Sequence, residues 1–195
     1  ERLITVYQVH SADVVTVEAP WARADAPHAD AMVTKARGIA LGVLAADCAP
    51  VLLADEAAQV IGTAHAGWKG ALGGVVESVV SAMERLGATR RGIRAAVGPC
   101  IGRASYEVGP EFHARFVEAD DGNRAFFDRS PRADHWQFDL PGYVLQRAAD
   151  ADLGNVQVIN QCTYEHADAY FSFRRATHRG EPDYGRNLSA IMLVS

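Results

Sequence analysis

The sequence predicts a single α+β domain in which mixed β-sheets are flanked by helices. Between residues 4 and 64, short apolar runs rich in β-branched residues alternate with turn-forming residues, which is typical of strands. Residues 71–86 instead repeat their apolar side chains at three- and four-residue spacings, which is typical of an amphipathic helix. The chain has 195 residues and 49% hydrophobic content, so it can bury one core and needs no second domain.

Three of the expected strands lead to a metal-binding or nucleophilic side chain, namely His10, Cys48 or His65. Residues 55–58 are expected to form the turn of a hairpin that returns His65 toward Cys48. The expected strands cover residues 4–9, 14–17, 31–34, 39–44, 51–54, 60–64, 93–97, 156–159 and 188–194.

Helices are expected over residues 71–86, 110–116 and 140–150, and Asp139 is placed to cap the last of them. Residues 65–70, HAGWKG, are expected to connect a strand to a helix. Their glycines would let backbone N–H groups face an anion, and a simple tight turn fits the same pattern. Residues 20–30 and 120–134 are expected to be loops.

Charge and cysteine content narrow the class of partner and the compartment. With 19 basic and 24 acidic residues, the net charge of −5 provides no electrostatic footprint for nucleic acid or an anionic membrane. We therefore expect a small molecule as the partner. Three cysteines without framework spacing, no signal-like stretch and no apolar run of membrane-spanning length lead us to expect a cytoplasmic protein. The pattern does not indicate an oligomeric state.

His10, Cys48 and His65 form a candidate metal site. Zinc fingers pair ligands a few residues apart, whereas these three must be brought together by the fold, as in catalytic metal sites. Two imidazoles and one thiolate suit Zn²⁺ and leave one tetrahedral position for water or substrate. From the pattern alone, a small buried cysteine and ordinary histidines are the more common interpretation.

Several motifs, in matching order, resemble one known family. They are QVHSADV, ADCAPVLLAD, TAHAGWKG, VGPCIGRASYEVG, the pair Cys162-Thr163, FSFRR and GRNLSAIML. Over residues 8–193 the chain resembles the multicopper polyphenol oxidase family, also called the laccase-domain, YfiH-like or purine nucleoside phosphorylase family. The resemblance implies a YfiH-like, cytotoxic necrotizing factor-like fold, with residues 1–195 as one catalytic domain. It also implies a metal held by His10, Cys48 and His65.

Family members ordinarily carry several dozen residues before the QVH motif, including a glycine-rich segment with an arginine near the substrate. We therefore expect residues 1–195 to lack the usual N-terminal segment, and its residues receive no role.

The resemblance further implies a zinc-dependent purine nucleoside enzyme. The expected activities are phosphorolysis of adenosine, inosine and 5′-methylthioadenosine, and deamination of adenosine, with the nucleoside and phosphate as partners. Zn²⁺ lowers the pKa of bound water to about 7, which generates a nucleophile at neutral pH. Asp47, beside the thiolate, is a candidate proton shuttle, ligand-supporting group or structural cap. Cys48 and His65 are candidate catalytic residues as well as ligands.

Lys69, Arg174 and Arg175 are the candidate phosphate-binding residues, because guanidinium and ammonium groups on an acidic chain can hold an anion. Solvated or salt-bridged side chains fit the same pattern. Tyr106 is expected to line the substrate pocket, and Cys100 is expected either to line it or to lie in the core.

Other functions remain open at this point. A copper-dependent, laccase-like polyphenol oxidase shares the His₂Cys ligand set, but true multicopper oxidases also need His-x-His pairs, and none occurs among the 7 histidines. A metal-free hydrolase would use Cys48 as nucleophile and His65 as base. Some family members suggest a peptidoglycan-precursor editing factor, and a metal-storage module is the non-enzymatic alternative.

Overall fold

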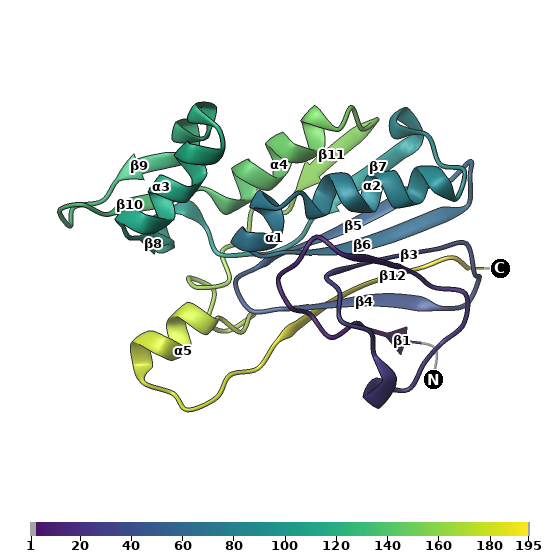
Figure 1. Cartoon of the computed structure of the whole chain (residues 1–195). Helices are drawn as coiled ribbons and strands as arrows, with labels where there is room; N and C mark the ends of the chain where they lie inside the picture. The colour runs from purple at the N-terminus through teal and green to yellow at the C-terminus, as the bar shows by residue number, and fades with distance from the viewer. Residues whose placement is uncertain (1–2, 195) are drawn as a thin grey trace.

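The computed structural model describes residues 3–194, and in them the central element is a mixed β-sheet (Figure 1). The sheet contains, in spatial order, β11 (Asn155–Val158), β7 (Ile93–Val97), β5 (Ala49–Asp55), β6 (Val60–Ala66), β3 (Ala31–Thr34) and β2 (Val14–Thr16). The four inner strands pair antiparallel, whereas the two edge strands pair parallel to their neighbours. The expected hairpin is confirmed as β5 and β6, with Pro50 opposite His65.

A second, three-stranded sheet packs beside the first. It consists of β1 (Leu3–Ile4), β4 (Ala40–Ala45) and β12 (Asn187–Met192), with β4 in the middle. Buried Ile4 and Leu41 from this sheet meet Met32 and Ile61 from the central sheet in one apolar cluster. The burial of these side chains joins the two sheets into one domain.

Helices cover the other face of the central sheet (Figure 1). These are α1 (Trp68–Leu72), α2 (Val75–Arg85) and α4 (Leu140–Asp150). Val79, Val80 and Met83 of α2 are fully buried against the strands. The Asp139 cap of α4 is confirmed, because its side chain accepts a hydrogen bond from the Gly142 amide.

The prediction of one continuous helix over residues 71–86 is wrong in its beginning and its continuity. Helix α1 already begins at Trp68, and the chain breaks at Gly73-Gly74 before α2 begins. Gly74 has φ +90°, a left-handed conformation that glycine adopts without steric cost. Apolar spacing alone did not reveal the break, because the apolar residues on both sides of it still face the sheet.

The segment between β7 and α4 forms a small subdomain that extends away from the main sheets, at the left of Figure 1. It contains η3 (Arg103–Ser105), β8 (Glu107–Val108), α3 (Pro110–Ala119), η4 (Asp121–Phe126), β9 (Phe127–Arg129) and β10 (Trp136–Phe138). Rings of Phe116, Phe127 and Phe138 pack together at its centre. Residues 120–134, expected to be a loop, are therefore partly ordered as η4 and β9, because aromatic packing outweighs their polar composition.

Two other predictions need correction. Residues 4–9 are not one strand, because β1 ends at Ile4 and the following residues run as an irregular segment to His10. Residues 20–30 contain η1 (Arg23–Asp25) and end in the buried Ala29 and Asp30, so this segment is not only a surface loop.

The remaining elements are η2 (Arg90–Gly92) and α5 (Phe173–Arg179). In the part of the chain described, no helix has the length and apolarity needed to cross a membrane.

Candidate metal centre and substrate pocket

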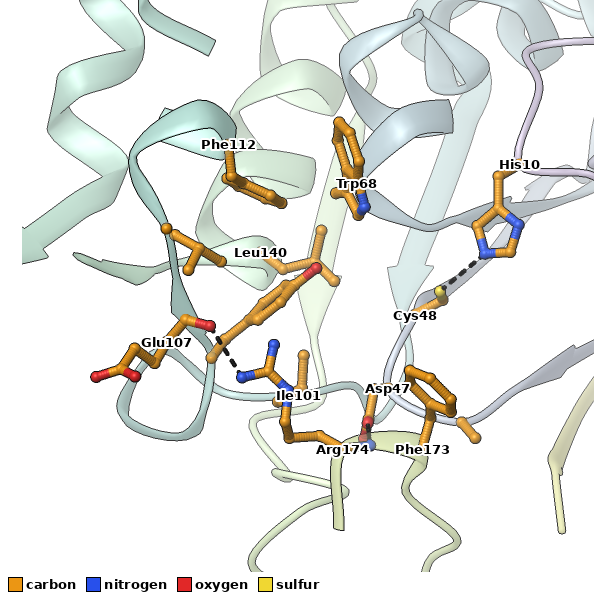
Figure 2. A pocket seen from close by; sticks show the side chains of 14 residues that line it. His10, Asp47, Cys48, Trp68, Ile101, Glu107, Phe112, Leu140, Phe173 and Arg174 are labelled. Carbon is orange, nitrogen blue, oxygen red and sulfur yellow. Dashed lines mark hydrogen bonds between the residues drawn. The ribbon is translucent and has the colours of Figure 1, made fainter. Parts of the chain in front are cut away.

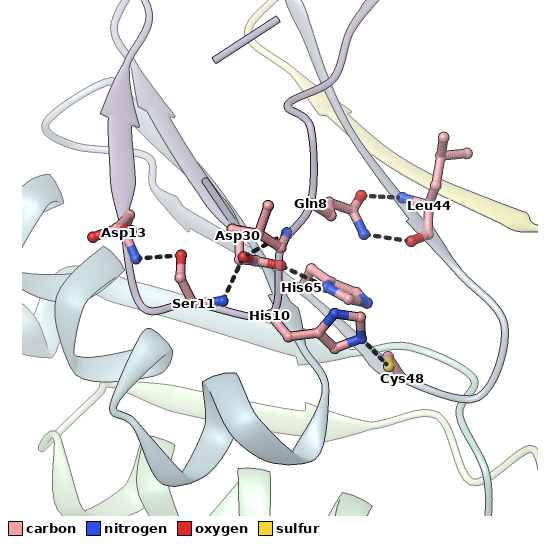
Figure 3. A network of polar contacts seen from close by, with 9 residues as sticks. Gln8, His10, Ser11, Asp13, Asp30, Leu44, Cys48 and His65 are labelled. Carbon is pink, nitrogen blue, oxygen red and sulfur yellow. Dashed lines mark hydrogen bonds and ion pairs between the residues drawn. The ribbon is translucent and has the colours of Figure 1, made fainter. Parts of the chain in front are cut away.

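The fold brings His10, Cys48 and His65 together, with one donor atom from each lying within 4.8 Å of the others. Cys48 Sγ lies 3.7 Å from His10 Nε2, and the two imidazole rings are 4.8 Å apart in an edge-on arrangement (Figure 3). The residues come from the segment after β1, the β4–β5 connection and the end of β6. Within residues 3–194, this is the group of His, Cys, Asp or Glu side chains that could hold a metal ion.

Local backbone geometry explains why the three side chains converge. Antiparallel pairing of β5 with β6 places the residue before β5, Cys48, beside the end of β6 that carries His65. Gly67 then passes so close to the group that a Cβ there would lie 2.7 Å from His10 Cδ2 and 2.9 Å from Cys48 Sγ. The glycine in the HAGW motif is therefore required by the close approach of backbone to the ligands.

Asp30 lies beside the ligand group, on the side away from Cys48, and orients both histidines (Figure 3). Its Oδ1 lies 2.8 Å from His65 Nδ1, which leaves Nε2 of that ring free to face Cys48 and His10. Its Oδ2 accepts hydrogen bonds from the amides of Val9 at 3.1 Å and Ser11 at 2.6 Å, on either side of His10. These bonds hold His10 at φ 62°. A carboxylate bound to the far nitrogen of a ligand histidine fixes the ring and its tautomer.

The electrostatics of the group favour a thiolate. Burial disfavours the charged form of Cys48, but hydrogen bonds and charge from His10 and His65 outweigh it and lower the pKa of the thiol to about 7. Burial likewise opposes a charge on His65, yet Asp30 and Cys48 raise the pKa of its ring to about 9. The thiolate is the form of Cys48 that binds metal, whereas the raised pKa of His65 favours a protonated ring, whose Nε2 proton a bound metal would displace.

The donor set therefore fits a single metal ion. Two imidazole nitrogens and one sulfur are ligand types that Zn²⁺ takes. Asp30 supplies the supporting hydrogen bond to His65. Three protein ligands are typical of catalytic zinc sites, which keep a further position for water or substrate.

A cavity of about 420 Å³ opens beside His10 and Cys48 (Figure 2). In this view Trp68 and Phe112 lie on one side of it, and Asp47, Phe173 and Arg174 lie on the other. Its lining includes Trp68, Tyr106, Phe112, Phe173, Glu107 and Arg174. Flat apolar surfaces beside a few polar groups are typical of small-molecule sites.

Arg174 is the cationic side chain of this cavity lining. Its Nη1 donates a hydrogen bond to the Glu107 carbonyl at 2.9 Å, and its guanidinium lies 5.3 Å from the Tyr106 ring centre (Figure 2). It has no carboxylate partner in the described part of the chain. A guanidinium without an acidic partner, at the edge of an apolar cavity, can accept an anionic group of a ligand.

The comparisons with known proteins decide the family. A family model described as "Multi-copper polyphenol oxidoreductase laccase" matches residues 1–194. This chain belongs to that laccase-like family. The resemblance drawn from the motifs is therefore confirmed.

Curated proteins similar to this chain are named as purine nucleoside phosphorylases. A protein of Rickettsia conorii named as a purine nucleoside phosphorylase is 35% identical over 194 residues, covering 99% of this chain and 79% of the relative. One from Streptomyces griseus with the same kind of name is 41% identical over 175 residues, covering 89% of this chain and 69% of the relative.

Solved structures share the fold of this family member and confirm the predicted fold class. A Neisseria meningitidis protein of the DUF152 family matches with a TM-score of 0.87 and 30% identity, covering 99% of this chain and 75% of that one. The YfiH protein of Bacillus licheniformis matches with a TM-score of 0.85 and 27% identity, covering 98% of this chain and 74% of that one.

The other residues expected at the substrate site lie in different surroundings. Tyr106 lines the cavity, and burial raises the pKa of its hydroxyl. Cys100 is buried outside the cavity lining, next to Cys162 in a β-bridge, and burial raises the pKa of its thiol. Lys69 is exposed, with Nζ 5.6 Å from the Trp68 ring centre, and lies outside the lining of the metal-side cavity.

Arg175 differs from its neighbour Arg174. Its guanidinium donates hydrogen bonds to the carbonyls of Thr163 at 2.6 Å and Tyr164 at 2.9 Å, and also to that of Tyr170. These bonds tie α5 to the preceding loop, so both terminal nitrogens of Arg175 already donate within the protein.

Sequence reasoning missed Asp30, Trp68 and Phe112 as site residues. Asp30 ends a segment rich in alanine and proline, and only the register of β3 against β6 places it beside His65. Trp68 sits in the HAGW motif, directly after the glycine that approaches the ligands, so its position was a usable signal. Phe112 reaches the cavity because the subdomain folds back over it, which no local pattern indicates.

Proposed function

We propose that this chain is a zinc-dependent purine nucleoside enzyme. The expected reactions are phosphorolysis of adenosine, inosine and 5′-methylthioadenosine, and deamination of adenosine. The observation that carries the proposal is the placement of the His10, Cys48 and His65 donors at one end of an aromatic-walled cavity with Arg174 beside it. The names of the relatives support the substrate class.

The cavity walls fit the parts of a nucleoside and its co-substrate. Trp68, Tyr106 and Phe112 offer flat apolar surfaces on which a purine can pack. Arg174 offers donors for phosphate. Cleavage of a glycosidic bond builds positive charge on the ribose, so a phosphate held beside the sugar both stabilises that charge and acts as the nucleophile.

His10, Cys48 and His65 would hold the zinc ion, which supplies Lewis acidity for polarising a substrate atom when bound. Asp30 keeps the His65 proton on Nδ1, so that Nε2 remains available as a ligand.

The test measures zinc content and nucleoside turnover on one preparation. Inosine turnover is followed as hypoxanthine release with and without inorganic phosphate, and adenosine deamination as ammonia release. We expect about one zinc per chain in the wild type, and loss of both zinc and turnover in His65→Ala while circular dichroism stays native. His28→Ala changes an exposed histidine stacked on Tyr7 and is the matched control. A fully active His65→Ala protein would refute the mechanism.

The same preparation distinguishes the other functions. Turnover by zinc-free protein that thiol alkylation blocks would instead support a cysteine hydrolase. Oxygen consumption with a phenol, dependent on bound copper, would support the polyphenol oxidase.

A further inference from the structure

Asp47 holds together three segments of the chain beside the candidate metal centre. Its Oδ1 accepts a hydrogen bond from Thr163 Oγ1 at 2.6 Å. Its Oδ2 accepts one from Ser172 Oγ at 3.0 Å and one from the Arg174 amide at 2.7 Å. The residue is only 8% exposed, and no basic side chain of residues 3–194 forms an ion pair with it.

The backbone around Asp47 is equally constrained. Asp47 has φ +88°, which is uncommon for a residue other than glycine, and its carbonyl accepts a hydrogen bond from the Ile101 amide at 3.0 Å. Since Cys48 follows directly, the bonds that hold this turn also set the direction in which the thiol points. Such strain persists only where the surroundings over-determine the conformation.

On the other side of Asp47, the same carboxylate fixes the start of α5. Ser172 caps this helix and donates to Asp47, and the Arg174 amide donates to the same oxygen. The Arg174 side chain then reaches the Glu107 carbonyl across the cavity edge (Figure 2). The position of the guanidinium therefore depends on the anchoring of α5 at Asp47.

We propose that Asp47 and Thr163 are positioning residues that fix the turn bearing Cys48 to the start of α5, and so place the Arg174 guanidinium for phosphate. This inference rests on the proposed function, in which Arg174 binds phosphate. Both carboxylate oxygens of Asp47 accept hydrogen bonds, from Thr163, from Ser172 and from the Arg174 amide, which assigns the group to holding these segments. Buried polar groups that are fully hydrogen-bonded specify one local arrangement, and a bond lost there leaves a partner unsatisfied.

The decisive variants are Thr163→Val and Thr163→Ser, compared as zinc-loaded proteins. Valine has the shape of threonine and removes the donor to Asp47, whereas serine keeps it. Binding of inorganic phosphate is measured by calorimetry, and zinc affinity by competition with a chromophoric chelator. We expect Thr163→Val to weaken phosphate binding about tenfold, because small displacements of a positioning group have large effects. Thr163→Ser should bind phosphate within about threefold of wild type.

A double-mutant cycle with Arg174→Ala separates positioning from general destabilisation. If Thr163 acts through Arg174, Thr163→Val should not weaken phosphate binding further in the Arg174→Ala background. A Thr163→Val protein that melts at a lower temperature but binds phosphate and zinc as the wild type does would overturn the inference. An equal loss in both backgrounds would also overturn it.

Direct phosphate binding keeps this inference separable from the proposed function. Absent nucleoside turnover with intact, Thr163-dependent phosphate binding would refute the proposed reaction alone. Wild-type phosphate affinity in Arg174→Ala would show that this guanidinium is not the phosphate site and would overturn the inference.

Discussion

Two buried aspartates, Asp30 and Asp47, lie beside the candidate metal centre, and they accept hydrogen bonds from different parts of the chain. Asp30 accepts hydrogen bonds from the ring of His65 and from the amides on either side of His10. Asp47 accepts its bonds from Thr163, Ser172 and the Arg174 amide, none of which belongs to the ligand group. One carboxylate therefore orients the ligands themselves, and the other connects the ligand group to the helix beside the cavity.

This difference shows that similar burial of two acids does not imply the same role. The Asp30 carboxyl is buried, which disfavours its charge, but hydrogen bonds from His65 and the neighbouring amides prevail and lower its pKa. Substitution of Asp30 should therefore lower metal affinity first. Substitutions at Asp47 and its α5 partners should lower phosphate affinity and the free energy of unfolding.

We expect the largest loss of zinc binding from a substitution at Gly67, whose backbone passes next to His10 and Cys48. In Gly67→Ala the new Cβ would approach His10 Cδ2 to 2.7 Å and Cys48 Sγ to 2.9 Å, so at least one ligand must move. Gly67 has φ −68°, which alanine adopts without strain, so the fold should be kept. We expect loss of stoichiometric zinc, measured by elemental analysis, with native circular dichroism. Retention of one zinc per chain at wild-type affinity would show that the three side chains do not share an ion.

A smaller effect is expected from Asp30→Asn. The amide nitrogen would face His65 Nδ1 and favour the tautomer that carries the proton on Nε2, which cannot then bind metal. We expect zinc affinity to fall about 10- to 100-fold, measured by chelator competition. Asp13→Asn is the control, because Asp13 is exposed near the same loop. Unchanged zinc affinity in Asp30→Asn would remove the distinction between the two aspartates.

The smallest effect on the site is expected from Arg175→Ala. This variant loses the hydrogen bonds to the carbonyls of Thr163, Tyr164 and Tyr170, so the free energy of unfolding should fall by about 1–3 kcal/mol. Zinc affinity should stay within about threefold of wild type, because no ligand is touched. Urea denaturation and chelator competition measure the two quantities. Arg174→Ala is the matched variant, and we expect it to keep its stability within about 1 kcal/mol.

Many of the strands and helices were predictable because the spacing of apolar residues that identifies them lies within a short stretch of sequence. The strand over residues 31–34, the β5–β6 hairpin and the Asp139-capped helix agree with their apolar spacing and cap chemistry. The break at Gly74 and the helix α5 were missed. Helix α5 is short, and its stability comes from the Ser172 cap and from the bonds to Asp47 rather than from an apolar stripe.

The candidate site was predictable only in part, for a physical reason. His10, Cys48 and His65 each occur in a recognisable motif, so their types and positions were readable. Asp30 and Thr163 act through contacts with residues distant in the sequence, and strand register and loop packing decide those contacts. Adjacent arginines illustrate the same limit of local patterns, because only the packing of α5 distinguishes Arg174 from Arg175.

The subdomain between β7 and α4 supplies one wall of the cavity, including Tyr106 and Phe112, but none of the three residues of the candidate metal group. Its aromatic side chains pack into the same buried core as β5 and β6, but the three donor side chains come from other segments. Under the proposed function, exchange of side chains on this wall would alter which ligand fits while the His10, Cys48 and His65 group stays unchanged. Such a division of the cavity would let ligand specificity change through the segment between β7 and α4 alone.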